Sequence, residues 1–306
     1  MIPDRSSASL TVDIEDWYHI PSVCGSTFSV FKDVEEFFKK WEGRYDYLTR
    51  NVEKVLRILD QYKIPATFFV VADVIEHYPG LVESIVDHGH EIACHGLHHS
   101  CVIDSRTKRP LLPPDAFREA TEKAKRDLEK ISGEKVVGYR APNALIAGWM
   151  VDHLEEIGFK YDSSVSVNSL YNKGDSPLNG VSSSPYYPVK NGLASGKERR
   201  IVEFPWAYWD FLGFKVPTSG GPMLRFLGSH IILKGIAQSL KRGHTVIYFH
   251  PIDISSEKFP AIGQGRPLYW MIKGDIVERR IRTIVKHLQN TRFLCLGDAL
   301  KEIDQI

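Results

Sequence analysis

Two short segments of this chain carry side chains that could bind a metal ion and activate water. Asp13, Glu15 and Asp16 follow one apolar, strand-like run, and His95 and His99 follow another. Imidazole and carboxylate are common zinc ligands, and a catalytic zinc site keeps one position open beyond its three protein ligands. A second carboxylate would remain to take a proton from water. This combination of residue types predicts metal-assisted hydrolysis.

The spacing of the two histidines supports a shared site. Residues four apart lie on one face if the chain enters a helical turn after the strand. Histidines are often hydrogen-bonded structural residues, but the position after a strand and the carboxylates elsewhere favour metal ligation. The third ligand stays open. Alternation sends Asp13 and Glu15 to the same side of an extended chain, whereas a turn after Ile14 would swing Asp16 inward.

Three further polar residues end strand-like runs. Arg140 could orient and ionise a base carboxylate through a bidentate pair, or it could form an ordinary structural ion pair. His250 follows the apolar run 245–249, where neighbouring carboxylates could tune it as a general acid. Asp162 could hold and charge this histidine.

An alternation of strand-like and helix-like segments along the chain would position these residues. The predicted strands are 9–14, 66–72, 91–94, 136–139, 159–161, 200–204, 245–249 and 293–295, and the predicted helices are 51–62, 81–88, 114–132, 148–157, 223–242 and 276–289. This alternation favours a mainly parallel sheet with right-handed crossovers. About seven βα units suggest closure into a barrel, in which the C-terminal strand ends share one face.

The composition sets limits on domain number, partners and location. The 306 residues are expected to form a single domain, 1–306, with a loop excursion at 163–199 that could act as a lid or binding wall. The net charge of +1 gives no global attraction to nucleic acid. A polar start and no apolar run of ~18 residues predict a cytoplasmic protein without an integral membrane segment, peripheral membrane association being the alternative. The sequence does not indicate an oligomeric state.

Several motifs together resemble those of one family. They are Ala66-Thr-Phe-Phe-Val70, Gly89-His-Glu-Ile-Ala-Cys-His95, Gly138-Tyr-Arg-Ala-Pro142, Gly158-Phe-Lys-Tyr-Asp-Ser-Ser164 and Tyr248-Phe-His-Pro251. The chain resembles the NodB-type polysaccharide deacetylases (carbohydrate esterase family four). Within them, Asp13-Ile-Glu-Asp-Trp17 is similar to the first motif of a subgroup that reads Asp-Val/Ile-Glu-Asp-Trp/Tyr. That subgroup is often found near exopolysaccharide or lipopolysaccharide genes.

The resemblance implies a deformed (β/α) barrel of about seven strands that hydrolyses an N-acetyl group on an amino sugar. The sugar would belong to a polysaccharide or its precursor, with cell-surface glycan or lipopolysaccharide biosynthesis as the expected setting. By motif position, the implied roles are Asp13 as base, His95 and His99 as metal ligands, Arg140 as the residue that steers Asp13, the backbone N–H of Asn143 as an oxyanion donor, and His250 as general acid assisted by Asp162.

One departure from the family pattern concerns the metal. The common first motif has two adjacent acids, the second being a metal ligand, and Ile14 occupies that second place here. The role must pass to Asp16 or Glu15, and Asp16 is favoured because the carboxylate must curl back toward the histidines. The expected ion is Zn2+, with Co2+, Ni2+ or Mn2+ as other candidates. Two competing hypotheses are an allantoinase-like hydrolase of cyclic amides and a barrel that binds a glycan without turnover.

Overall fold

A parallel sheet curled into a barrel forms the centre of the molecule. The computed structural model describes residues 6–20, 23–24, 31–41, 46–104, 109–166, 181–190, 192–257 and 272–303. The sheet follows the order β11-β1-β2-β3-β4-β5-β8, and every neighbouring pair is parallel. These strands are β1 (Ser7–Ile14), β2 (Ala66–Val70), β3 (Glu91–Cys94), β4 (Gly138–Tyr139), β5 (Tyr161–Asp162), β8 (Val202–Glu203) and β11 (Thr245–Phe249).

The two ends of this sheet meet and close the barrel. Beyond β8, Trp206 forms a parallel bridge with Val246 of β11, and the N–H of Ala207 donates to the carbonyl of Val246 at 3.1 Å. A short strand, β12 (Arg292–Phe293), pairs with the start of β1. The predicted deformed (β/α) barrel of seven strands is confirmed.

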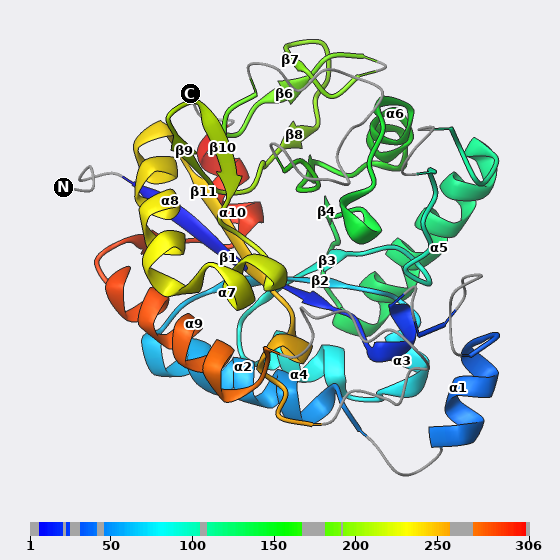
Figure 1. Cartoon of the computed structure of the whole chain (residues 1–306). Coiled ribbons are helices and arrows are strands. Elements are labelled where there is room, and N and C mark those ends of the chain that lie inside the picture. Colours follow the sequence, from blue (N-terminus) through cyan, green and yellow to red (C-terminus); the bar gives the residue numbers. More distant parts are fainter. Residues whose placement is uncertain are drawn as a thin grey trace.

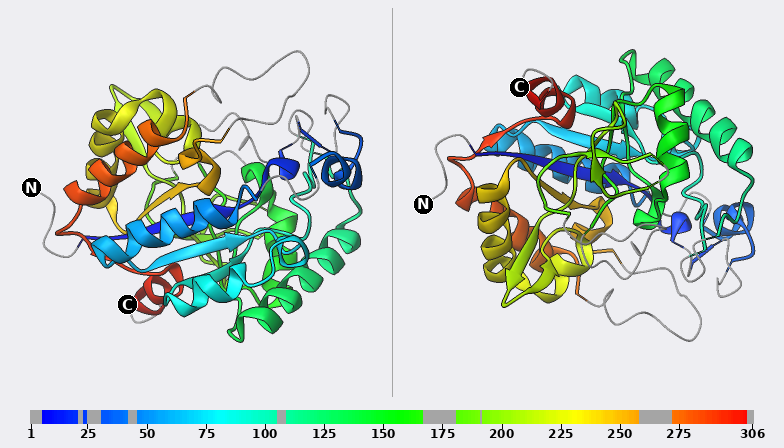
Figure 2. Two further views of the ribbon diagram at one scale, coloured as in Figure 1. Left: turned by 90° about the horizontal axis from the view of Figure 1, so that it is seen from below. Right: turned by 90° about the horizontal axis from the view of Figure 1, so that it is seen from above.

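Helices surround the sheet (Figures 1 and 2). They are α1 (Val34–Trp41), α2 (Thr49–Tyr62), α3 (Val74–His77), α4 (Leu81–Asp87), α5 (Pro114–Ser132), α6 (Gly148–Ile157), α7 (Gly221–Phe226), α8 (Gly228–Arg242), α9 (Asp275–His287) and α10 (Leu296–Ile303). Helix α8 packs on α9 and α9 on α2, while α4 packs on α5 and α5 on α6. The predicted helix 223–242 is interrupted, because Gly228 has φ +69° and starts a new helix.

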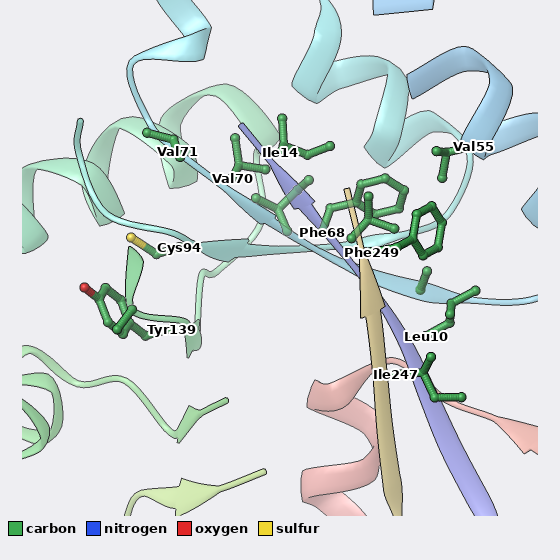
Figure 3. Packing of buried hydrophobic residues seen from close by; sticks show 14 of the residues in the cluster. Leu10, Ile14, Val55, Phe68, Val70, Val71, Cys94, Tyr139, Ile247 and Phe249 are labelled. Atoms are coloured by element: carbon green, nitrogen blue, oxygen red, sulfur yellow. The ribbon is translucent and has the colours of Figure 1, made fainter. Parts of the chain in front are cut away.

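The alternation of side chains along β1 separates the core from the site. Leu10, Val12 and Ile14 are buried against the outer helices, as expected for a central parallel strand. Figure 3 shows this layer, with Leu10 and Ile14 of β1, Phe68 and Val70 of β2, Phe249 of β11 and Val55 of α2. The intervening residues Thr11 and Asp13 point to the other face, where both contact Arg140. The inside of the barrel is therefore polar at its mouth.

Two antiparallel hairpins lie outside the barrel sheet. One joins β6 (Tyr187–Pro188) to β7 (Ser195–Gly196), within the predicted loop excursion 163–199. Residues 167–180 and 191 of that excursion lie outside the described part of the chain. The other joins β9 (Tyr208–Phe211) to β10 (Phe214–Pro217), and the sequence analysis did not predict it. No helix in the described ranges is long and apolar enough to cross a bilayer.

Candidate active site

The chain stays extended for two residues past the end of β1, and this places the acids. Asp13 pairs in register with Phe69 of β2, and its side chain faces into the barrel. Glu15 lies two residues on and therefore on the same side. The turn begins only at Asp16, which caps a 3-10 turn at Trp17–His19. Asp13 and Glu15 are thus brought together at the barrel mouth.

Both candidate metal-binding histidines are held by backbone carbonyls. His95 follows β3, where its N–H donates to the carbonyl of Val70 at 2.8 Å. Its Nδ1 lies 2.8 Å from the carbonyl oxygen of Arg140, and Nδ1 of His99 lies 3.1 Å from that of His19. A carbonyl can only accept, so both Nδ1 atoms carry the proton. Each Nε2 is left for a cation, which is the usual way of orienting a metal-binding imidazole.

Glu15 completes a group of three possible ligands with these histidines. One ligand atom from each of Glu15, His95 and His99 lies within 4.8 Å of the other two, and all three side chains are buried. Oε2 of Glu15 is 2.7 Å from Nε2 of His99. This Nε2 and the carboxylate oxygen face each other at the mouth and could serve as ligands of one ion. One carboxylate and two imidazoles form a ligand set that suits zinc.

The electrostatics of this group also suit a cation. Burial acts to raise the pKa of Glu15, but the charges of His99 and His250 outweigh it and hold that pKa below its usual range. Burial lowers the pKa of His95 to about 4, so its ring is neutral at physiological pH. An ionised carboxylate and a neutral imidazole are the protonation states that bind metal.

Arg140 occupies the centre of the barrel mouth and is buried. Its Nη1 donates to Oδ1 of Asp13 at 2.6 Å and to Oγ1 of Thr11 at 2.9 Å. Nε and Nη2 donate to the carbonyl and hydroxyl of Ser163, at 2.8 and 2.9 Å. The guanidinium also lies 4.0 Å from the centroid of the Phe69 ring. The pair with Asp13 is fixed from several sides, which orients the carboxylate.

His250 reaches the same mouth from β11. Its Nε2 lies 3.4 Å from Oε1 of Glu15 and 3.8 Å from Oδ2 of Asp13. On the other side of the ring, Nδ1 is 3.0 Å from Oδ2 of Asp253, and Arg225 donates to Oδ1 of that carboxylate. Burial acts to lower the pKa of His250, but Glu15 and Asp253 raise it to about 9. The ring is protonated at neutral pH and can donate a proton.

Comparison with known proteins finds similarity over two parts of this barrel. Residues 41–161 match the family model described as polysaccharide deacetylase. This part of the chain is similar to the polysaccharide deacetylases. Residues 169–298 match a second model, described as a domain of unknown function (DUF3473). The barrel sheet draws strands from both matched segments, because β8, β11 and β12 come from the second.

Two curated relatives share sequence with part of this chain. A peptidoglycan deacetylase-like protein of Gibberella zeae is 34% identical over 118 residues, which are 38% of this chain and 32% of that protein. A peptidoglycan deacetylase of Helicobacter pylori is 30% identical over 119 residues, which are 39% of this chain and 38% of that protein. The chain thus spans about a third of the length of these relatives.

Solved structures share the fold of this chain. A Mycobacterium smegmatis protein assigned to the polysaccharide deacetylases is 20% identical, with a TM-score of 0.62 over 99% of this chain and 92% of that one. The allantoinase PuuE is 16% identical, with a TM-score of 0.57 over 96% of this chain and 89% of that one. At these identities the likeness concerns the fold alone. The family resemblance inferred from the motifs is confirmed, and the finer subgroup stays a prediction.

The structure brings Glu15, and not Asp16, to the two histidines, contrary to the preference from sequence. The carboxylate of Asp16 turns away from the mouth, where Oδ1 accepts from the N–H of Trp17 at 2.6 Å and Oδ2 accepts from the hydroxyl of Tyr78. Burial raises the pKa of Asp16. Asp16 would face the histidines only if the chain turned directly after Ile14, whereas the turn begins at Asp16. The alternation of side chains along the extended chain therefore brings Glu15 to the histidines.

The structure also gives His250 a different partner from the expected one. Asp162 ends β5 and accepts from the hydroxyl of Ser164 at 2.7 Å, with the carboxyl of Glu203 beside it. Burial raises the pKa of Asp162. Among the described residues, the carboxylate that bonds to the ring of His250 is Asp253. Its position three residues on, after a proline, is a signal that the sequence offered and the analysis did not use.

Asn143 lies in a tight turn beside the mouth. Residues Pro142–Ala144 form a 3-10 turn directly after Arg140 and Ala141, and Asn143 has φ +54°. Its side-chain amide donates to Sγ of Cys101 at 3.3 Å. The left-handed backbone at this residue sets the direction of the peptide groups that flank it. The role of its backbone N–H as an oxyanion donor stays a prediction.

Proposed function

We propose that this chain is a metal-dependent N-deacetylase that removes acetate from an amino sugar. The observation that carries the proposal is the convergence of three groups at one barrel mouth. These are the candidate ligands Glu15, His95 and His99, the pair Asp13–Arg140, and the pair His250–Asp253. Ligands, base and acid are the components that amide hydrolysis requires.

A divalent ion held by Glu15, His95 and His99, with zinc as the proposed ion, would supply Lewis acidity toward the acetyl carbonyl and toward water. Asp13 accepts a proton from the attacking water, and the hydrogen bond from Arg140 holds its carboxylate in place. The N–H of Asn143 donates to the oxygen that becomes negative as the carbonyl is attacked.

The leaving amine needs a proton, and His250 is placed to give it. Its Nε2 faces the mouth and its Nδ1 is held by Asp253, so the proton that leaves is the one on Nε2. Arg225 holds Asp253 from behind. These contacts fix the ring in one orientation while it donates. The products are acetate and a free amino sugar.

The proposed substrate is an N-acetylated sugar of a cell-surface glycan or of its precursor, including those of lipopolysaccharide. The names of the relatives from Gibberella and Helicobacter, which refer to peptidoglycan, support a glycan as the substrate class. The allantoinase-like hydrolysis of a cyclic amide and a glycan-binding barrel without turnover are the competing hypotheses. The acid–base set beside the ligands counts against a barrel that only binds, and the substrate panel below separates the two hydrolases.

The test is acetate release from a panel of N-acetylated monosaccharides, nucleotide sugars and oligosaccharides, with small cyclic amides alongside. We expect acetate from at least one sugar, loss of turnover with a chelator, and recovery on adding zinc. His95→Ala should lose both metal content and turnover, whereas His88→Ala, which changes a half-exposed histidine bonded to the carbonyl of Ser84, should keep both. Turnover of cyclic amides alone, or full activity of His95→Ala, would overturn the proposal.

A further inference from the structure

The hairpin β9–β10 carries an apolar tip that faces solvent. The exposed fractions are 49% for Phe211, 85% for Leu212 and 75% for Phe214. The tip is a two-residue turn, since Phe211 pairs with Phe214, and Leu212 and Gly213 have φ of +52° and +86°. Such turns favour asparagine or glycine at both positions. Leucine is unfavourable here because the turn requires a positive φ and because its apolar side chain is exposed to water. Its presence points to a function in binding.

Aromatic rings and cations lie directly behind this tip. The Trp209 and Phe211 rings are 4.8 Å apart, and Nζ of Lys234 on α8 lies 5.6 Å from the Trp209 ring. Nζ of Lys215 lies 5.3 Å from the ring of Tyr208. Aromatic rings with adjacent lysines match the region of a bilayer between headgroups and acyl chains.

The charge of this part of the chain is one-sided. Residues 208–242 contain five Lys or Arg residues and one acid, Asp210, but Arg225 is buried and paired with Asp253. The other four cations and Asp210 give +3, whereas the whole chain of 306 residues carries +1. Helix α8 contributes three of these cations and no acid. An excess of cations around an exposed apolar loop complements an anionic lipid surface.

The hairpin is also firmly supported. The N–H of Tyr208 donates to the hydroxyl of Ser239 at 3.2 Å, and that of Asp210 donates to Oε1 of Gln238 at 2.8 Å. Both partners lie on α8. Figures 1 and 2 show the hairpin on the outside of α8, at the edge of the molecule. A rigid support holds the tip away from the body of the protein.

We propose that the tip of the β9–β10 hairpin inserts into the surface of an anionic membrane, with the cations of α8 at the lipid headgroups. The protein is then a peripheral membrane protein, bound by Phe211, Leu212 and Phe214 together with electrostatic attraction. This proposal does not depend on amide hydrolysis, because none of these residues belongs to the candidate active site. It places the enzyme at a surface where lipid-linked or envelope glycans are present.

The test is co-sedimentation with vesicles of phosphatidylcholine alone and of phosphatidylcholine with phosphatidylglycerol. We expect binding to the anionic vesicles, weakening as salt is raised. The triple change Phe211→Ser, Leu212→Ser and Phe214→Ser should lower the partition coefficient by about tenfold or more, because it removes the apolar surface that enters the bilayer. Leu111→Ser, at a residue 56% exposed elsewhere on the surface, should bind as the parent does.

Three results would overturn the proposal. The first is a parent protein that stays in the supernatant with anionic vesicles. The second is a triple variant that binds as the parent does while its circular dichroism shows a folded protein. The third is a dimer in light scattering that the triple variant abolishes, because the tip would then cover a second copy of the chain. Acetate release from a soluble sugar by the triple variant reports separately on the proposed enzyme activity.

Discussion

Replacing Glu15 by glutamine and Asp16 by asparagine, one at a time, tests which acid binds the metal. The two substitutions are matched, because each removes one negative charge from neighbouring buried carboxyls and changes the shape little. The structure predicts opposite outcomes for them. Glu15 faces His99 across 2.7 Å, whereas Asp16 faces Tyr78 and the backbone of Trp17.

The expected magnitudes follow from these contacts. Loss of an outer hydrogen-bond partner of a ligand weakens metal binding by ~10–100-fold, so loss of Glu15 itself should exceed about 100-fold, or about 2.8 kcal/mol. Asp16→Asn keeps an oxygen that can accept from Trp17 and an amide that can donate to Tyr78. We expect it to cost stability of about 1 kcal/mol and to leave the zinc affinity within about threefold.

The assay is a zinc titration against a competing chromophoric chelator, with metal content after dialysis as a second readout. Urea unfolding of the metal-free variants separates loss of affinity from loss of fold. Normal zinc affinity in Glu15→Gln together with a large loss in Asp16→Asn would refute the assignment. It would mean that the turn after β1 differs from the one described here.

Three further changes probe the supports of the site. Arg140→Gln leaves Asp13 as a buried carboxylate without its partner, so the free energy of unfolding should fall by about 3–5 kcal/mol in urea titrations, and an unchanged midpoint would contradict this. Asp253→Asn removes a charge that raises the pKa of His250, so that pKa should fall. Because His250 can donate a proton only below its pKa, the alkaline limb of the pH profile of kcat/KM should move to lower pH. Gly221→Ala would press a Cβ against the Asp253 carboxylate, so the free energy of unfolding should fall by about 1–3 kcal/mol and the thermal midpoint should fall with it. An unchanged thermal midpoint would contradict this packing.

The sequence predicted the barrel because its repeating pattern is strong. Apolar runs of strand length alternate with helical periodicity, and the residues at the strand ends must then share one face. His95 and Arg140 could be found in this way, since each comes directly after a strand, and His99 through its spacing of four from His95. The location in the cytoplasm was predicted from the sequence as well, and it stays a prediction.

The predictions that the structure contradicts, the third metal ligand and the partner of His250, depend on where single turns begin. Whether Glu15 or Asp16 faces the histidines changes with a turn one residue earlier or later, and local sequence does not fix that position. Asp253 was missed because a partner for His250 was sought at another strand end, whereas a 3-10 turn folds it back. The β9–β10 hairpin was missed because both of its faces contain aromatic residues and its turn lacks asparagine.

The position of β1 in the sheet has a consequence for synthesis. This strand carries the proposed base, yet one of its two long neighbours, β11, ends only at Phe249. While the ribosome is still making the middle of the chain, β1 has an open edge, and such edges invite wrong pairing. The barrel cannot close until the ribosome has passed residue 249. We expect nascent chains stopped near residue 200 to be cut readily by proteases and to bind chaperones, and full-length chains to resist.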